Sequence, residues 1–367
     1  MYIALAKLFV QTRTEPHLST ICIGAPVEDA AAVCKENGYS KVGVVFSKNT
    51  EGIAGRVINS LKKAGVASEK IRIEDGETSK DVENATGLLQ KMRLAGLDRH
   101  CALVAVGGGV LGDVSAYAAS TYMRGIPVIQ VPTTLLAMVD SAVGGKTGVN
   151  LDGKNIVGTF HPADAVIIDF STLATLPAGE YRQGLAEIAK AACIGDELLF
   201  ALLESDAQKI LARDPQTLCA AVEAALKVKA RLVETDPRES VSNTSESSRM
   251  LLNFGHSFAH AIEAESGYSV RHGDAVAIGM VAAAHASGKL FGLAKSDILR
   301  IKKTLSAFGL PTAVSQEPGK LLVRMKSDKK NRAGETALVL LKSIGRPQVA
   351  RNVPDSIVLD ALKSASA

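Results

Sequence analysis

The chain has 367 residues, of which 47% are apolar, so it is long enough to bury hydrophobic cores in two domains of ordinary size. Its formal net charge of +4 comes without the clustered basic runs of a nucleic-acid-binding protein, and aromatic residues make up only 4%. We therefore expect no nucleic-acid partner, and we favour a small anionic ligand over a polyanion.

Sequence features of secreted and membrane proteins are missing. No run of 18 apolar residues occurs, and the apolar segment near the N-terminus is too short for a signal peptide. The five cysteines are scattered and lack the CxxC spacing of metal or redox motifs. We expect a cytoplasmic protein with reduced thiols and no membrane partner.

The first part of the chain alternates short β-branched runs with helical stretches. Residues 41–47, KVGVVFS, predict a buried strand, and residues 52–65, GIAGRVINSLKKAG, predict the helix that follows it. A short strand after residue 70 then ends in the turn Asp75-Gly76-Glu77. This alternation is typical of right-handed βαβ units and a parallel sheet, which binds ligands at the carboxyl ends of its strands.

A glycine turn forms the next unit. Residues 101–120, CALVAVGGGVLGDVSAYAAS, predict a strand that runs into three glycines and then a helix. Glycines at this place let a phosphate approach backbone N–H groups at the positive end of a helix. The pattern differs from the GxGxxG of the usual dinucleotide fold and is also compatible with a simple tight turn. It favours a phosphate-bearing ligand near Gly108 to Asp113.

The following predicted strand leads into Thr133, Thr134, Asp140 and Lys146. The GGKT around Lys146 resembles a P-loop, but that motif needs a glycine where Asp140 stands. This spacing excludes the NTPase interpretation.

Residues 151–177 complete the first half. Lys154 and Asn155 lie on a predicted hairpin-like turn, and the apolar strand that follows ends in Thr172 to Thr175. Pro177 marks the expected domain boundary, because the sequence after it is mostly helical. We expect an α/β domain over residues 1–177 and an all-α domain over residues 178–367, with an apolar hairpin after the basic turn Lys329-Lys330.

Residues 249–263, RMLLNFGHSFAHAIE, contain the densest set of polar groups in an apolar setting. Arg249, Asn253, His256 and His260 are spaced by four, three and four residues, which predicts one polar stripe along a single helix. Apolar residues fill the rest of that helix, so the polar groups are expected in a dry place, as in a binding site. An ordinary core helix whose histidines bond to the backbone fits a lone HxxxH pattern equally well.

Two imidazoles and one carboxylate from different helices make a zinc site with one open position, which is the catalytic arrangement. Glu187, His256 and His272 are such a set, and His260 competes for one place because it shares a face with His256. Basic and amide side chains suited to a phosphate and a carboxylate accompany them. These are Lys146, Lys154, Lys190, Lys229, Arg249 and Lys330, with Asn155 and Asn253. The combination suggests redox chemistry at a carbinol of a phosphorylated acid.

Eight segments in order, from about Asp75 to Gly345, resemble the 3-dehydroquinate synthase family. They are DGETSK, GGGVLGDV, TYMRGIPVIQVPTTLLAMVDSAVGGKTGVN, GKNIVGTFHP, GLAEIAK, LLNFGHSFAHAIE, RHGDAVAIGM and SDKKNRAG. The resemblance implies an NAD-binding α/β domain over residues 1–177, a helical metal- and substrate-binding domain over residues 178–367, and a homodimer.

The resemblance also implies roles for individual residues. Glu187, His256 and His272 would bind Zn²⁺, or Co²⁺ in its place. The residues near NAD would be Asp75, Gly76, Glu77, Lys80, Gly108, Gly109, Val110, Leu111, Gly112, Asp113, Thr133, Thr134, Asp140, Lys146, Lys154, Thr172, Leu173, Ala174 and Thr175. The substrate contacts would be Asp140, Lys146, Asn155, Lys190, Lys229, Arg249, Asn253, His260 and Lys330, with Arg124 reaching a partner subunit's site.

The reaction implied by the resemblance converts 3-deoxy-D-arabino-heptulosonate 7-phosphate to 3-dehydroquinate and phosphate. Zinc polarises the ring hydroxyls so that hydride leaves C5 for NAD⁺. The ketone acidifies the C6 proton, phosphate leaves from C7, the hydride returns, and the opened ring closes as an aldol. The cofactor is regenerated, so the protein chiefly positions the reactants.

Three other functions remain as alternatives. A metal-dependent alcohol or glycerol dehydrogenase would leave the basic groups idle. A related sugar-phosphate cyclase would bind a substrate without the carboxylate, whereas Arg249, Asn253 and His260 together favour the acid. A non-catalytic NAD-binding protein would leave buried polar groups without partners. The chain departs from the family pattern at Ser47, which replaces an acidic residue that commonly meets the adenosine ribose, at Ala259, and in a longer loop between Glu239 and Arg249.

Overall fold

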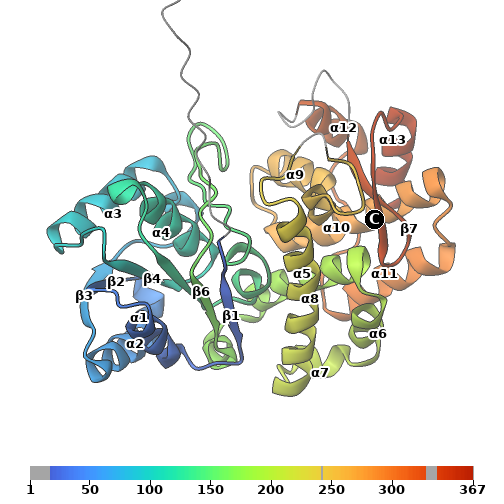
Figure 1. The fold of residues 1–367 in the computed structure, drawn as a ribbon. Helices are drawn as coiled ribbons and strands as arrows, with labels where there is room; N and C mark the ends of the chain where they lie inside the picture. The colour runs from blue at the N-terminus through green and yellow to red at the C-terminus, as the bar shows by residue number, and fades with distance from the viewer. Residues whose placement is uncertain (1–16, 241–242, 328–336, 367) are drawn as a thin grey trace, which may run out of the picture.

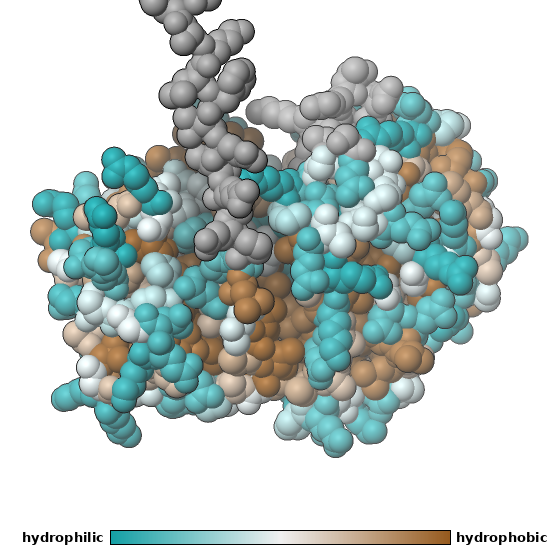
Figure 2. Space-filling view, viewed as in Figure 1, coloured by the Kyte–Doolittle hydropathy of each residue, from teal (hydrophilic) through white to brown (hydrophobic). Residues whose placement is uncertain are grey.

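The computed structural model describes residues 17–240, 243–327 and 337–366. Two halves lie side by side, an α/β half in blue to green and a helical half in light green to red (Figure 1). On the face seen in Figure 2, hydrophobic side chains concentrate where the halves meet, and polar side chains cover much of the outer surface. No helix in the described part of the chain has the length and apolar character of a membrane span.

A six-stranded sheet organises the α/β half. Its strand order is β1-β6-β5-β4-β2-β3, and every neighbouring pair is parallel, as the alternating sequence pattern predicted. The strands are β1 (Thr20–Ile23), β2 (Lys41–Phe46), β3 (Ala67–Arg72), β4 (Ala102–Gly107), β5 (Val128–Pro132) and β6 (Ala165–Ile168).

Helices cover both faces of this sheet. Because both faces are buried, its central strands are apolar at nearly every position. Leu103 and Ala105 of β4 belong to one buried cluster, whereas Val104 and Val106 belong to the other, as expected when successive side chains point to opposite faces. The helices are α1 (Ala30–Glu36), α2 (Glu51–Ala64), α3 (Val82–Leu94) and α4 (Gly109–Thr121).

Short helical turns follow most strands of the sheet, and one follows helix α4. They are η1 (Val27–Asp29), η2 (Lys48–Thr50), η3 (Glu77–Ser79), η4 (Tyr122–Arg124), η5 (Ala137–Ser141) and η6 (Phe170–Thr175). Residues 146–160 then form a hairpin arm, with antiparallel bridges between Lys146 and Phe160 and between Val149 and Val157. The arm, drawn in green in Figure 1, leaves the sheet at the side of the helical half.

The second half is helical, as predicted, and contains the expected apolar hairpin. Its helices are α5 (Ala178–Gly195), α6 (Glu197–Ser205), α7 (Ala207–Leu211), α8 (Pro215–Thr235), η7 (Arg249–Asn253), α9 (His256–Glu265), α10 (His272–Phe291), α11 (Lys295–Ala307), α12 (Pro318–Ser327) and α13 (Asp355–Ser364). The hairpin is the antiparallel pair β7 (Leu338–Ser343) and β8 (Arg346–Ala350). Helix α5 begins directly after Pro177.

Helix α10 forms the centre of the helical half. It is apolar on all sides and packs against α5, α9, α13 and β7, which is why its residues from Ala275 to Ala284 are buried. A Cβ added to Gly279 would lie 2.2 Å from the carbonyl oxygen of Gly255. The start of α9 is therefore pressed against α10, and this contact fixes where His256 lies.

The prediction of one continuous helix over residues 249–263 was wrong. Helix η7 ends at Asn253, and α9 begins at His256. Between them Gly255 has φ of 80°, a left-handed conformation that glycine adopts without steric cost. The four polar residues of the expected stripe therefore lie on two elements, with Arg249 and Asn253 on η7 and the two histidines on α9.

Candidate active site at the junction of the two halves

Three side chains that could bind a metal converge in the helical half. Glu187 comes from the middle of α5, whereas His256 and His272 are the first residues of α9 and α10. Oε1 of Glu187 lies 3.7 Å from Nε2 of His256 and 3.5 Å from Nε2 of His272. One ligand atom from each residue lies within 4.8 Å of the others.

The chemistry of this triad fits a divalent cation. The carboxylate of Glu187 is buried, with Oε2 paired to Lys190 and Oε1 facing the two imidazoles. A buried carboxylate needs compensating positive charge, and Oε1 has no hydrogen bond of good geometry among the described residues, so it is available to a cation. Two imidazoles with one carboxylate form a donor set of catalytic zinc sites, which keep a fourth position open.

The charges of the triad are set by its surroundings. Burial raises the pKa of Glu187, but Lys190 and the two histidines outweigh it and hold this pKa at about 2. Burial and the positive charge of Lys190 lower the pKa of His256 to about 3. Burial also lowers the pKa of His272, but the carboxylates of Glu187 and Glu263 raise it to about 9. At neutral pH one proton must therefore leave the triad before a cation binds.

His260, the other histidine that the spacing allowed as a ligand, lies one turn further along α9. The ring centroid of His260 is 5.8 Å from that of His256. The ring centroid of His272 is 5.3 Å from that of His256. The structure therefore brings all three histidines to one place, with His260 beside the group formed by Glu187, His256 and His272.

Two buried lysines lie beside the triad. Lys190 forms an ion pair with Glu187 one turn away on α5, and the carboxylates of Glu187 and Asp140 raise its pKa above the usual range, although burial lowers it. Lys229 of α8 contacts both the carboxylate and the backbone carbonyl of Asp140 in η5. The pairing of Lys229 with Asp140 joins the two halves, and the charges of Lys229 and Lys190 hold the pKa of the Asp140 carboxyl below its usual range in spite of burial.

A second polar cluster surrounds Glu239, which the sequence analysis did not assign to the site. Its carboxylate accepts from Nδ2 of Asn253 at 2.8 Å and forms an ion pair with Lys146. Arg249 is 2% exposed, donates from Nη1 to the carbonyl of Pro237 at 2.7 Å, and keeps a buried Nε that has no hydrogen bond among the described residues. In the sequence, Glu239 stands in a short charged run before the Ser-rich stretch. Residue spacing does not show that Glu239 lies next to Lys146.

The glycine turn lies at the carboxyl end of β4, as predicted, and α4 starts from it. Gly108 is the N-cap of α4, and Gly109 is its first residue. A Cβ on Gly109 would lie 2.9 Å from Oγ of Ser141, and one on Gly112 would lie 2.8 Å from Oε1 of Gln130. A Cβ at either position would push these side chains aside, whereas glycine leaves the helix N-terminus open to an anionic group.

Polar residues predicted near NAD form a connected set around this turn. Nζ of Lys80 donates to Oδ2 of Asp113 at 2.6 Å and to Oδ1 of Asn155 on the hairpin arm at 2.7 Å. Oε1 of Glu77 accepts from Nδ2 of Asn150 at 2.9 Å. Burial raises the pKa of Asp113 to about 6, although Lys80 opposes this effect.

The remaining residues predicted near NAD follow three further strand ends. Thr133 and Thr134 come directly after β5, and residues Thr172 to Thr175 lie in η6 after β6. Oγ of Ser47, directly after β2, donates to Oδ2 of Asp75 at 3.2 Å. The carboxyl ends of neighbouring parallel strands thus bring these residues to one edge of the sheet, which is where α/β proteins bind ligands.

Arg124 and Lys154 are predicted site residues that lie neither at the glycine turn nor in the two polar clusters above. Arg124 is exposed in η4 and has a positive φ of 71°. Lys154 of the hairpin arm reaches Glu263 of α9 instead of the glycine turn, with Nζ 3.1 Å from Oε1. Lys330 lies outside the described residues.

Family models match most of the chain. Residues 70–183 match the one described as 3-dehydroquinate synthase N-terminal, and residues 184–331 match the one described as 3-dehydroquinate synthase C-terminal. The chain belongs to the 3-dehydroquinate synthase family. A relative from this family, the 3-dehydroquinate synthase of Xylella fastidiosa (strain 9a5c), is 45% identical over 300 residues, which cover 79% of this chain and 75% of the relative.

Solved structures of two synthases have the same fold as this chain. ValA, a 2-epi-5-epi-valiolone synthase from Streptomyces hygroscopicus subsp. jinggangensis 5008 with NAD⁺ and Zn²⁺ bound, superimposes with a TM-score of 0.88 at 26% identity, over 98% of this chain and 99% of that chain. A 2-deoxy-scyllo-inosose synthase complexed with carbaglucose-6-phosphate, NAD⁺ and Co²⁺ gives 0.80 at 23% identity, over 94% and 96%. The second likeness supports the fold alone.

Proposed function

We propose that this protein is a 3-dehydroquinate synthase, a phosphate-eliminating carbon–oxygen lyase of the shikimate pathway. It converts 3-deoxy-D-arabino-heptulosonate 7-phosphate to 3-dehydroquinate and phosphate through a transient, NAD-dependent oxidation. The observation that carries this proposal is the placement of the Glu187–His256–His272 triad beside buried basic groups, at the junction with the half that holds the glycine turn. Membership of the family supports the same activity.

Two cofactors follow from this proposal. Glu187, His256 and His272 would hold Zn²⁺ or Co²⁺, which when bound supplies a Lewis acid for the substrate hydroxyls. NAD would lie along the glycine turn and the neighbouring strand ends, and it supplies a reversible hydride acceptor. We assign the NAD-binding role to residues 1–177 and the metal- and substrate-binding role to residues 178–367.

The chain's own residues would bind and orient the substrate. The buried Nε of Arg249 is a donor for the substrate carboxylate, and Asn253 lies beside it on η7. Lys146 and Asn253 both contact Glu239, so an anionic group that binds there competes with Glu239 for the same donors. Lys190 is buried and charged, which suits it to hold negative charge on the substrate, with His260 as a further positioning donor.

A homodimer in the cytoplasm is part of this proposal. Oγ1 of Thr159 at the base of the hairpin arm donates to Oγ of Ser120 at 2.8 Å, so the arm and the end of α4 are neighbours. The arm and η4, which directly follows α4, carry exposed hydrophobic side chains that a second subunit would cover, and Arg124 is the residue after Met123. These side chains are Met123, Leu151, Ile156 and Phe160.

Phosphate release from 3-deoxy-D-arabino-heptulosonate 7-phosphate tests the function. We expect release that requires NAD⁺, stops when a chelator removes the metal, and proceeds without net accumulation of NADH, because the hydride returns to the substrate. A dehydrogenase would instead accumulate NADH in proportion to product. Absence of phosphate release from the protein loaded with metal and NAD⁺ would refute the proposal.

A second cyclase activity is a candidate, because the solved valiolone synthase has nearly the same fold. A heptulose phosphate without the carboxylate separates the two activities. If this substrate releases phosphate faster than the heptulosonate, then Arg249 does not select for the carboxylate and the valiolone-type activity is favoured.

Replacing Lys146 with alanine is expected to weaken binding of the phosphorylated substrate roughly 10- to 100-fold, because a charge-assisted hydrogen bond contributes about 1.5–3 kcal/mol. The Kd of NAD should change by no more than about twofold, as measured by isothermal titration of each ligand separately. Lys63→Ala, at an exposed lysine of α2, is the control. Equal losses for substrate and NAD would contradict a substrate role for Lys146.

A further inference from the structure

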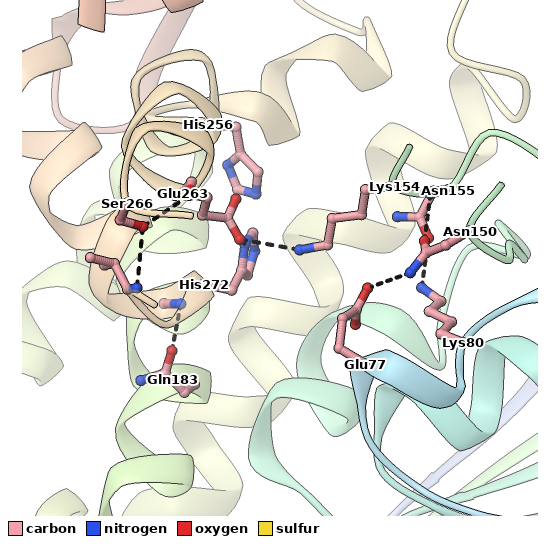
Figure 3. A network of polar contacts seen from close by, with 12 residues as sticks. Glu77, Lys80, Asn150, Lys154, Asn155, Gln183, His256, Glu263, Ser266 and His272 are labelled. Carbon is pink, nitrogen blue, oxygen red and sulfur yellow. Dashed lines mark hydrogen bonds and ion pairs between the residues drawn. The ribbon is translucent and has the colours of Figure 1, made fainter. Parts of the chain in front are cut away.

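Glu263 is a second carboxylate beside the triad, and the roles proposed above do not use it. It lies on α9, seven residues after His256, and it is 4% exposed. Its Oε1 lies 3.4 Å from Nδ1 of His272 and 3.1 Å from Nζ of Lys154. In Figure 3 it stands between the imidazole of His272 and the lysine that reaches over from the hairpin arm.

The imidazole of His272 lies between two carboxylates. Its Nε2 faces Glu187 at 3.5 Å, and its Nδ1 faces Glu263 at 3.4 Å. A carboxylate at Nδ1 favours the tautomer that carries its proton there, which leaves the lone pair of Nε2 available on the side of Glu187 and His256. Glu263 thus lies on the side of the ring that faces away from Glu187.

The charge of Glu263 is compensated from the other half of the protein. Its buried carboxylate lies 3.1 Å from Nζ of Lys154, and this positive charge offsets the cost of burying a carboxylate. Lys154 is held near by its arm, since the next residue, Asn155, accepts from Lys80, and Asn150 donates to Glu77 (Figure 3). A buried, ionised side chain with partners on both sides has a fixed position.

We propose that Glu263 is a positioning residue that orients His272 for the metal without binding the metal itself. This inference rests on the metal site of the proposed function. The geometry that carries it is the contact between Glu263 and the ring nitrogen opposite the one that faces Glu187. A carboxylate behind a metal-binding histidine fixes the ring and raises its basicity, and the loss of such a partner typically weakens metal binding 10- to 100-fold.

The test compares metal affinity among variants of the full chain. We expect Glu263→Ala to raise the Kd of Zn²⁺ about 10- to 100-fold, measured by competition with a chromophoric chelator. Glu263→Gln should have a smaller effect, because its amide oxygen can accept a hydrogen bond from Nδ1 but carries no charge. Glu265→Ala is the matched control, since Glu265 lies on the same helix and pairs with Arg324 at 2.9 Å, and it should bind Zn²⁺ as the unmodified protein does.

The visible absorption of the Co²⁺-loaded protein gives a second measurement that a merely structural role would not change. We expect the Co²⁺ bands of Glu263→Ala to differ from those of Glu265→Ala, because the imidazole is held less firmly. Wild-type Zn²⁺ affinity and an unchanged Co²⁺ spectrum in Glu263→Ala would overturn the proposal. If circular dichroism shows that this variant is unfolded, Glu263→Gln decides by the same two measurements.

Failure of the metal site itself would have a different signature. If the unmodified protein and Glu265→Ala bind neither Zn²⁺ nor Co²⁺, the proposed function loses its metal and the role of Glu263 falls with it. If the unmodified protein and Glu265→Ala bind metal, and the Glu263 variants bind it with the same affinity, the metal site stands and only the positioning role is wrong.

Discussion

Replacing His272 with alanine is expected to lower the rate of phosphate release roughly 10³-fold or more and to leave the protein without stoichiometric metal. A Lewis-acid cation contributes several kcal/mol to transition-state stabilisation, and each 1.4 kcal/mol is tenfold in rate. The variant keeps only Glu187 and His256 of the triad, and a site with two protein ligands is below the three that catalytic zinc sites use. Metal content by atomic emission and phosphate release are the measurements.

His285 provides the matched control for this substitution. It lies on the same helix as His272 and is half-buried, and the structure gives it no contact with the triad among the described residues. Burial lowers its pKa, and the charge of Lys302 lowers it further. His285→Ala should keep both the metal and the activity, apart from a modest loss of stability. Stoichiometric metal in His272→Ala would show that the ligand set is wrong, whatever the activity of the variant.

Local patterns were sufficient to predict the sheet. The β-branched run at residues 41–47 became β2, and the helix expected at residues 52–65 is α2, shifted by one residue. Strand β2 is buried on both faces of a parallel sheet, so its hydrophobicity and its secondary structure follow from the same cause. The glycines after β4 were equally informative, because a Cβ on Gly109 or Gly112 would press on the side chains of Ser141 and Gln130.

The error over residues 249–263 has a specific cause. Periodicity was counted through Gly255, and the apolar residues on both sides satisfied a helical pattern without showing that the backbone turns there. The positive φ of Gly255 is imposed by tertiary packing, since Gly279 of α10 lies against its carbonyl oxygen. A glycine before the first histidine was the available warning.

The site was less predictable than the fold because its members meet only in three dimensions. Spacing placed His256 and His260 on one face but carried no information about His272, which begins a different helix. Glu263 looked like one more polar residue of α9, and its two partners lie on α10 and on the hairpin arm. Contacts of this kind depend on how elements pack, which local sequence does not specify.

Ser47 illustrates how a departure from a family pattern can be compensated. In the family pattern the residue directly after β2 is commonly acidic, and this chain has Ser47 there. In the structure Ser47 is 1% exposed and donates to Oδ2 of Asp75, which follows β3. A carboxylate therefore still lies at the carboxyl end of β2, although it comes from the neighbouring strand end.

The affinity of the metal-free protein for Zn²⁺ is expected to increase about tenfold for each pH unit between pH 7 and pH 9, and to level off above that. The cause is His272, whose pKa is about 9 because Glu187 and Glu263 outweigh the effect of burial. Glu187 and His256 have pKa values of about 2 and about 3, so they are already deprotonated at pH 7. Zn²⁺ thus displaces one proton, and the total change is about 100-fold.

Competition titrations at several pH values measure this slope, and calorimetry in buffers of different ionisation enthalpy measures the single proton released near pH 7. The same raised pKa affects folding of the metal-free protein: its stabilising effect is fully present below the ordinary pKa of about 6.5 and is lost as the pH rises through about 9. The melting temperature of the metal-free form should therefore fall over this range, whereas that of the Zn²⁺-bound form should not follow it. A pH-independent Kd would mean that His272 is neutral before metal binds, and that Glu187 and Glu263 do not hold a proton on it.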